Sequence, residues 1–188
     1  METLNPQFLL SIEVNARAII ISIAILAAPL ILVLLEKKNP RKELFLPKFN
    51  AIDSVVKALG LFALAFLALF AQGLILSGLG LLDNQSVAKL ITMQDALTLF
   101  LAVTIGPIGE ELLFRGYLLK KIGLWPQAIL FAALHYGYGS VAEVLAALTV
   151  GVLFGLFVLR EKSIYAPILA HAMYNLFSII VVLSFAGA

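Results

Sequence analysis

The chain has 188 residues, of which 62% are hydrophobic and 13% are charged, and its formal net charge is +2. Soluble domains carry about twice this share of charged residues, so we predict an integral membrane protein. So small a net charge does not point to nucleic-acid binding, and the absence of cysteine excludes disulfides, thiolate zinc sites and a cysteine nucleophile.

Long apolar blocks alternate with short polar segments along the chain. After a mixed stretch at residues 1–15, which we interpret as an arm at the membrane interface, the blocks occupy residues 16–35, 54–82, 96–119, 123–138, 141–159 and 164–185. The first block is not interpreted as a cleaved signal peptide, because its basic residues follow the apolar run instead of preceding it. In the fifth block, Gly151 and Gly155 form a small-xxx-small pattern that predicts close helix packing. We therefore predict an all-α fold, a polytopic transmembrane helix bundle of about six spanning helices.

Basic residues mark one side of this predicted bundle. They cluster at residues 37–48, 120–121 and 160–162, and with six spans all three clusters fall on the same side. The positive-inside rule then places the loop 36–48 in the cytoplasm and both termini outside. We expect a multi-pass protein of a prokaryotic plasma membrane, whose basic loop faces anionic lipid.

Residues 105–119 hold three ionisable side chains, Glu110, Glu111 and Arg115, in an otherwise apolar segment. An ionisable group inside a membrane costs about 2.5–3.5 kcal/mol on insertion scales and usually has a function. Glu111 and Arg115 are one helical turn apart and can pair, whereas Glu110 points about 100° away from Glu111. The glycines and the proline before the glutamates predict a kink or an unwound turn within residues 105–111.

Both histidines of the chain lie in apolar blocks, and Asn175 shares a helix face with His171. Counted from the basic ends of their helices at about 1.5 Å per residue, Glu110, His135 and His171 reach similar depths. Singly, each polar residue has a structural explanation as a hydrogen-bonded link between helices, and Glu111 as part of a salt bridge. Their matched depth favours one pocket between the third, fourth and sixth spans, near the middle of the membrane and open toward the basic side.

Three motifs in this region have a specific order and spacing: Glu110-Glu111-x-x-x-Arg115, Phe131-x-x-x-His135 and His171-x-x-x-Asn175. Together they resemble the signature of the CAAX protease and bacteriocin-processing (CPBP, or Abi) family of intramembrane proteases. The resemblance covers about residues 96–185. It implies that residues 96–188 form a four-helix catalytic core and that residues 1–95 add the arm and two spans.

The resemblance also implies an activity, namely hydrolysis of a peptide bond by an intramembrane endopeptidase. The substrate would be a membrane-associated peptide or a lipidated protein, either CAAX-like or of the bacteriocin type. The implied roles are activation of water by Glu110 assisted by His135, and donation to the oxyanion by His171 and Asn175. Glu111 and Arg115 would hold their helix in place, as structural support.

Alternatives remain open at this point. We favour a glutamate-dependent reaction without a cofactor or metal, because no H-E-x-x-H motif is present. A zinc metalloprotease that uses the two histidines and a glutamate is the alternative. A non-catalytic immunity or scaffold protein that binds a peptide in the same pocket would carry the same residues. A proton-coupled transporter is disfavoured, since the sequence shows neither an internal repeat nor matched broken helices.

Overall fold

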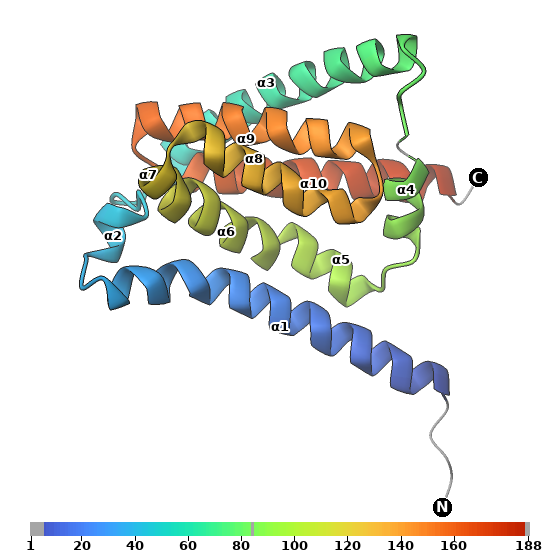
Figure 1. Ribbon diagram of the computed structural model, residues 1–188, viewed down its shortest axis with the longest axis horizontal. Helices are drawn as coiled ribbons and strands as arrows, with labels where there is room; N and C mark the ends of the chain where they lie inside the picture. Colours follow the sequence, from blue (N-terminus) through green and yellow to red (C-terminus); the bar gives the residue numbers. More distant parts are fainter. Residues whose placement is uncertain (1–5, 84, 187–188) are drawn as a thin grey trace, which may run out of the picture.

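The structure is a computed structural model that describes residues 6–83 and 85–186, and within these ranges all regular secondary structure is helical. Five helical segments are long and apolar enough to cross a membrane, at residues 16–35, 51–78, 96–122, 141–161 and 165–185. This confirms the all-α bundle of about six spans. Figure 1 shows the long helices side by side along the longest axis. Four of them are α1 (Pro6–Leu35), α3 (Ala51–Gly78), α9 (Val141–Glu161) and α10 (Tyr165–Ala186).

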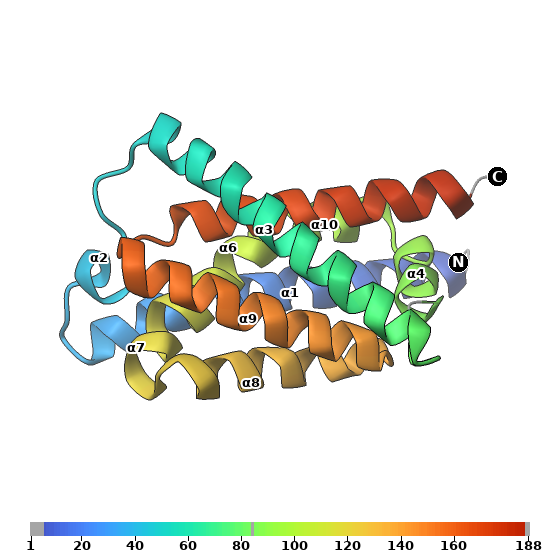
Figure 2. The same ribbon diagram turned by 90° about the horizontal axis from the view of Figure 1, so that it is seen from above.

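The segment expected as the fourth span is shorter than a regular spanning helix. It forms α8 (Leu124–Leu134), followed by a single turn of 3-10 helix, η2 (His135–Tyr138). Figure 2 shows α8 running alongside α9. An added Cβ at Gly151 would lie 3.0 Å from the Ala128 side chain, and one at Gly155 would lie 2.5 Å from Leu124. The predicted close packing at the two glycines is therefore confirmed, with α8 as the partner.

The third span is divided into four helical pieces. They are α5 (Ala96–Val103), α6 (Ile105–Glu111), the π-helix η1 (Leu112–Leu118) and α7 (Leu119–Ile122). The break between α5 and α6 lies at Thr104, whose φ of −110° and ψ of −80° are not helical. Pro107 has no N–H to donate to the carbonyl four residues earlier, which accounts for a break on its N-terminal side. The predicted kink within residues 105–111 is wrong, because that stretch is one regular helix; the π-helix was not predicted.

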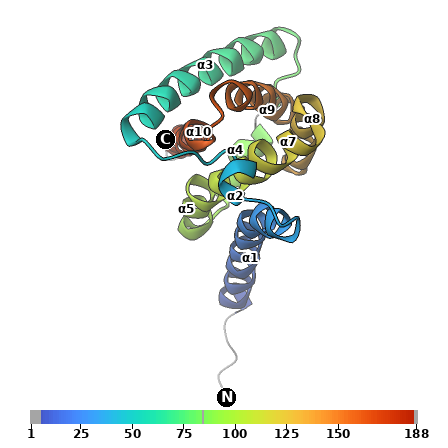
Figure 3. The ribbon, with the colours of Figure 1, turned by 90° about the vertical axis from the view of Figure 1, so that its left-hand side faces the viewer.

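The two N-terminal spans pack on opposite sides of the remaining helices. Viewed along the bundle, α3 lies over α9 and α10, and α1 lies on the far side next to α5 and α6 (Figure 3). α1 approaches α6 closely at Gly109, where an added Cβ would lie 2.9 Å from Ile25. The predicted interfacial arm is helical from Pro6, and residues 1–5 lie outside the described residues. The division of the chain near residue 95 stays a prediction.

The predicted basic clusters meet at one end of the bundle. There α2 (Pro40–Glu43) lies beside α7 (Figure 1), and Lys120 pairs with Glu43 at 3.2 Å. Glu36 accepts hydrogen bonds from Lys121 and Tyr117, and together with Lys38 these lower the pKa of Glu36 to about 2. The short amphipathic helix α4 (Gln85–Thr92) lies at the opposite end.

Candidate active site

Glu111 and Arg115 form a fully buried ion pair in the third span. Glu111 Oε1 lies 3.0 Å from Arg115 Nη1, and both side chains are 0% exposed. The guanidinium also faces the rings of Phe131, at 4.0 Å, and Phe154, at 5.7 Å. No nitrogen of Arg115 forms a well-aligned hydrogen bond within the described part of the chain. The carboxylate and the two ring faces therefore balance the buried charge.

His171 on α10 lies between the two glutamates of α6. Its Nδ1 is 2.9 Å from Glu111 Oε1, and its Nε2 is 3.8 Å from Glu110 Oε2. An ionised carboxylate only accepts hydrogen bonds, so Nδ1 carries the proton in this contact. Glu110, unlike Glu111, is half-buried. Arg115 and His171 thus both hold Glu111, and Glu110 faces the second nitrogen of the same imidazole.

His135 and Asn175 are each fixed by a backbone carbonyl. His135 Nδ1 lies 2.8 Å from the carbonyl oxygen of Phe131, one turn earlier on α8. This contact places a proton on Nδ1 and leaves Nε2 as an acceptor when the ring is neutral. Asn175 Nδ2 donates to the carbonyl of Ala102 at 2.8 Å, in the last turn of α5 before the break. The second hydrogen of that amide remains for another acceptor.

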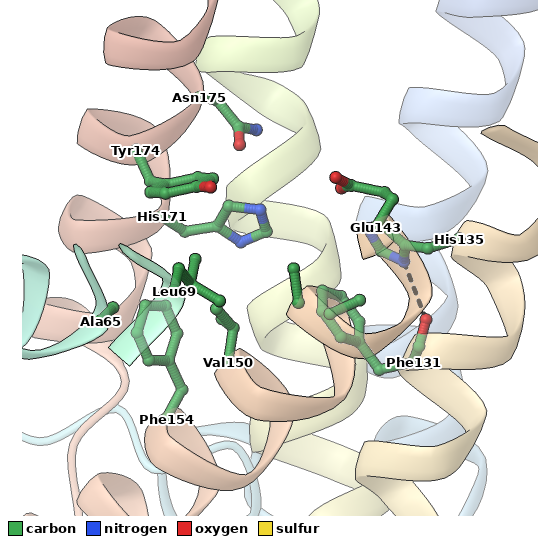
Figure 4. A pocket seen from close by; sticks show the side chains of 12 residues that line it. Ala65, Leu69, Phe131, His135, Glu143, Val150, Phe154, His171, Tyr174 and Asn175 are labelled. Carbon is green, nitrogen blue, oxygen red and sulfur yellow. Dashed lines mark hydrogen bonds between the residues drawn. The ribbon is translucent and has the colours of Figure 1, made fainter. Parts of the chain in front are cut away.

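Two adjoining cavities lie at this site. His135, His171 and Asn175 line a small pocket of about 40 Å³ (Figure 4). A larger cavity of about 340 Å³ shares Glu143, Tyr174 and Asn175 with it and is otherwise lined mainly by apolar side chains of α4, α5 and α10. The larger cavity extends toward α4, at the end of the bundle opposite the basic clusters. The expected opening of the small pocket toward the basic end stays a prediction. Glu110 lines neither cavity and reaches the site through His171.

Glu143, in the first turn of α9, is an ionisable residue of the pocket wall that lies outside the three sequence motifs. Glu143 lines both cavities. Figure 4 shows its carboxylate pointing into the pocket, between His135 and Asn175. An acidic residue inside an apolar block was the signal that could have indicated it.

In the ranges that the structure describes, no three His, Cys, Asp or Glu side chains group closely enough to hold a metal ion. Catalytic zinc usually has three protein ligands. The zinc alternative therefore lacks a fitting donor set here.

The matches with known proteins fall on this same region. The family model of type II CAAX prenyl endopeptidase Rce1-like proteins matches residues 92–177. That range contains all three motifs and, apart from Ala65 and Leu69, the residues that line the small pocket. Residues 92–177 are thus similar to the Rce1-like family. The Rce1-like segment thus begins at the last residue of α4 and ends within α10.

Two curated relatives from Bacillus subtilis (strain 168) are similar to the chain. The "Uncharacterized protein YpbD" is 34% identical over 94 residues, which cover 48% of this chain and 49% of the relative. The "Putative membrane peptidase YdiL" is 29% identical over 131 residues, which cover 61% of this chain and 52% of the relative. The chain thus spans about half the length of the curated relatives it matches. No solved structure matches the chain.

Proposed function

We propose that the protein is an intramembrane endopeptidase that hydrolyses a peptide bond with Glu110 as the base that activates water. The observation that carries the proposal is the position of His171, between Glu110 and Glu111 and on the wall of the pocket that also contains His135 and Asn175. Imidazoles and an amide donor on the wall of one small pocket, with a carboxylate facing one imidazole, are groups that amide hydrolysis uses. The Rce1-like family of residues 92–177 and the peptidase named among the relatives support the same activity.

In the proposed reaction, the carboxylate of Glu110 takes a proton from water as the water oxygen bonds to the scissile carbonyl carbon. Nε2 of His135, held toward the pocket by the bond from Nδ1 to Phe131, assists by accepting a hydrogen bond from the same water. The carbonyl oxygen becomes an oxyanion. Glu110 then returns the proton to the amide nitrogen, the C–N bond breaks, and a carboxylic acid and an amine leave.

The oxyanion is stabilised by His171 and Asn175. Asn175 uses one amide hydrogen on Ala102 and has a second for the oxyanion. His171 donates from Nε2 when both of its ring nitrogens are protonated. One oxyanion donor is typically worth about 3–4 kcal/mol in the transition state.

The substrate in this proposal is a membrane-associated peptide or a lipidated protein, either CAAX-like or of the bacteriocin type. The mainly apolar walls of the 340 Å³ cavity suit an apolar segment of such a substrate. The protein lies in the plasma membrane of a prokaryote, with the basic end at α2 and α7 in the cytoplasm. The α4 end, where the cavity extends, then faces outward.

The test is cleavage of prenylated and unprenylated peptides by the full chain in nanodiscs, wild type beside Glu110→Gln, with and without a strong chelator. We expect wild-type cleavage that the chelator leaves intact and that Glu110→Gln abolishes. Cleavage that survives in Glu110→Gln would show that the role of Glu110 is wrong. Cleavage lost on chelation would show that the metal-independent mechanism is wrong. Binding of these peptides without cleavage by the wild type would favour the non-catalytic immunity or scaffold protein.

A further inference from the structure

Glu143 belongs to none of the three motifs, and its position in the sequence suggests an ordinary structural role. α9 begins after Ser140, whose Oγ accepts a hydrogen bond from the Glu143 N–H at 3.0 Å. Ser140-x-x-Glu143 is the pattern of a capping box, in which the glutamate side chain folds back onto the helix start. A glutamate so engaged would not be available to a ligand.

In the structure another residue, Asp83 from the connection between α3 and α4, holds the start of α9. Asp83 Oδ2 accepts from the N–H of Val141 at 2.7 Å. Its Oδ1 accepts from the N–H of Ala142 at 3.0 Å and from the Ser140 hydroxyl at 2.7 Å. Asp83 thus caps α9 from outside the helix, and the Glu143 side chain points into the pocket (Figure 4).

The carboxylate of Glu143 has no lysine or arginine to pair with among the residues that the structure describes. It forms neither a hydrogen bond nor an ion pair with a residue of the described part of the chain, although His135 and His171 are near enough to act on it electrostatically. Neither cavity is lined by a lysine or an arginine. The buried Arg115 is paired with Glu111. An unpaired carboxylate in mainly apolar surroundings is costly, and a cation brought by a ligand would remove that cost.

From these contacts we infer that Glu143 selects substrates: it binds the side chain of a lysine or arginine of the peptide close to the scissile bond. The position next to the bond follows because Glu143 lines both the small pocket with the two histidines and the larger cavity. This inference rests on the proposed function, since the cation belongs to the peptide that is cleaved. It predicts a preference for cationic peptides and rejection of acidic ones at the same position.

The test measures binding separately from cleavage. Three short fluorescent peptides share the same apolar sequence around one central residue, which is lysine, norleucine or glutamate. Each peptide is titrated against the full chain in nanodiscs, in the Glu110→Gln background. We expect the lysine peptide to bind about tenfold more tightly than the norleucine peptide, as for a partly desolvated ion pair. Glu143→Gln should remove this preference, and Glu143→Lys should shift it to the glutamate peptide.

Asp53→Asn is the matched control, because it removes one negative charge from the exposed start of α3, away from both cavities. It should leave the lysine preference unchanged. Equal affinity for the lysine and norleucine peptides when Glu143 is present, including no binding of either, would overturn the inference. A lysine preference that survives Glu143→Gln would also overturn it. Failure of the proposed protease function shows separately, as an absence of cleavage by the protein that retains Glu110.

Discussion

The imidazole of His171 binds the carboxylate of Glu111 through Nδ1, at 2.9 Å. This contact joins α10 to α6 at the point where the buried guanidinium of Arg115 reaches the same carboxylate oxygen at 3.0 Å. Glu111 therefore serves two partners at once. The orientation of His171, which we propose to stabilise the oxyanion, depends on Glu111, which does not itself contact the substrate.

Replacing Glu111 by glutamine should destabilise the protein strongly. The variant keeps the size of the side chain but leaves the charge of Arg115 buried without a counter-charge, a change that typically costs about 3–5 kcal/mol. The measurement is thermal unfolding of both proteins in the same detergent. Glu110→Gln is the control, because Glu110 is half-buried and lies 3.8 Å from its nearest ion-pair partner, His171. Equal unfolding temperatures for the two variants would contradict the structural role of Glu111.

Gly109→Ala should weaken the packing of α1 on α6. The new Cβ would lie 2.9 Å from Ile25 Cγ2 and 3.0 Å from the backbone nitrogen of Leu26, so α1 must shift. Overpacking of this kind costs about 1–3 kcal/mol. Gly60→Ala in α3 is the control, since an added Cβ there meets no atom within 4 Å and alanine favours a helix. Thermal unfolding should show a lower unfolding temperature for Gly109→Ala and no decrease for Gly60→Ala.

Asn175→Asp should slow peptide hydrolysis while preserving side-chain size. The substitution removes both amide hydrogens, including the one donated to Ala102, and places a carboxylate where the oxyanion is proposed to form. Loss of one oxyanion donor typically lowers kcat about 10²–10³-fold. Ser178→Ala, which changes a residue of the larger cavity that does not line the small pocket, should retain most of the activity. An Asn175→Asp protein with wild-type kcat would remove Asn175 from the proposed oxyanion site.

The capping of α9 by Asp83 should make stability depend on pH. Hydrogen bonds from Ala142, Ser140 and Val141 lower the pKa of Asp83 below its ordinary value of 3.8. A carboxyl group with a lowered pKa in the folded state stabilises that state fully above its unfolded pKa. This contribution is lost as the pH falls through the folded pKa.

The corresponding measurement compares the unfolding temperature of the wild type with that of Asp83→Asn across pH. The difference between the two unfolding temperatures should be largest near pH 7 and should become smaller below about pH 4. Asp53→Asn, which affects an exposed carboxylate at the start of α3, serves as the control for a simple change in charge. A difference between wild type and Asp83→Asn that stays constant down to low pH would contradict the capping role.

The sequence was sufficient for the features that depend on local pattern. Apolar blocks of spanning length predict helices whatever their neighbours are. The spacing of four between Glu111 and Arg115 predicts their contact, because residues one turn apart share a helix face. The glycines at 151 and 155 predict a close helix neighbour, since only small side chains allow backbones to approach.

Only the tertiary structure shows the side-chain contacts between residues that are distant in the sequence. The capping-box pattern at Ser140 predicts a glutamate bound to its own helix, but Asp83, more than fifty residues earlier, caps α9, and the Glu143 side chain points into the pocket. Likewise, spacing pairs Glu111 with Arg115 but does not reveal that His171 shares the same oxygen. Hydrophobic patterning thus determined which segments enter the membrane. Which polar side chains face the cavity depends on contacts between residues distant in the sequence, and these contacts form only when the helices pack.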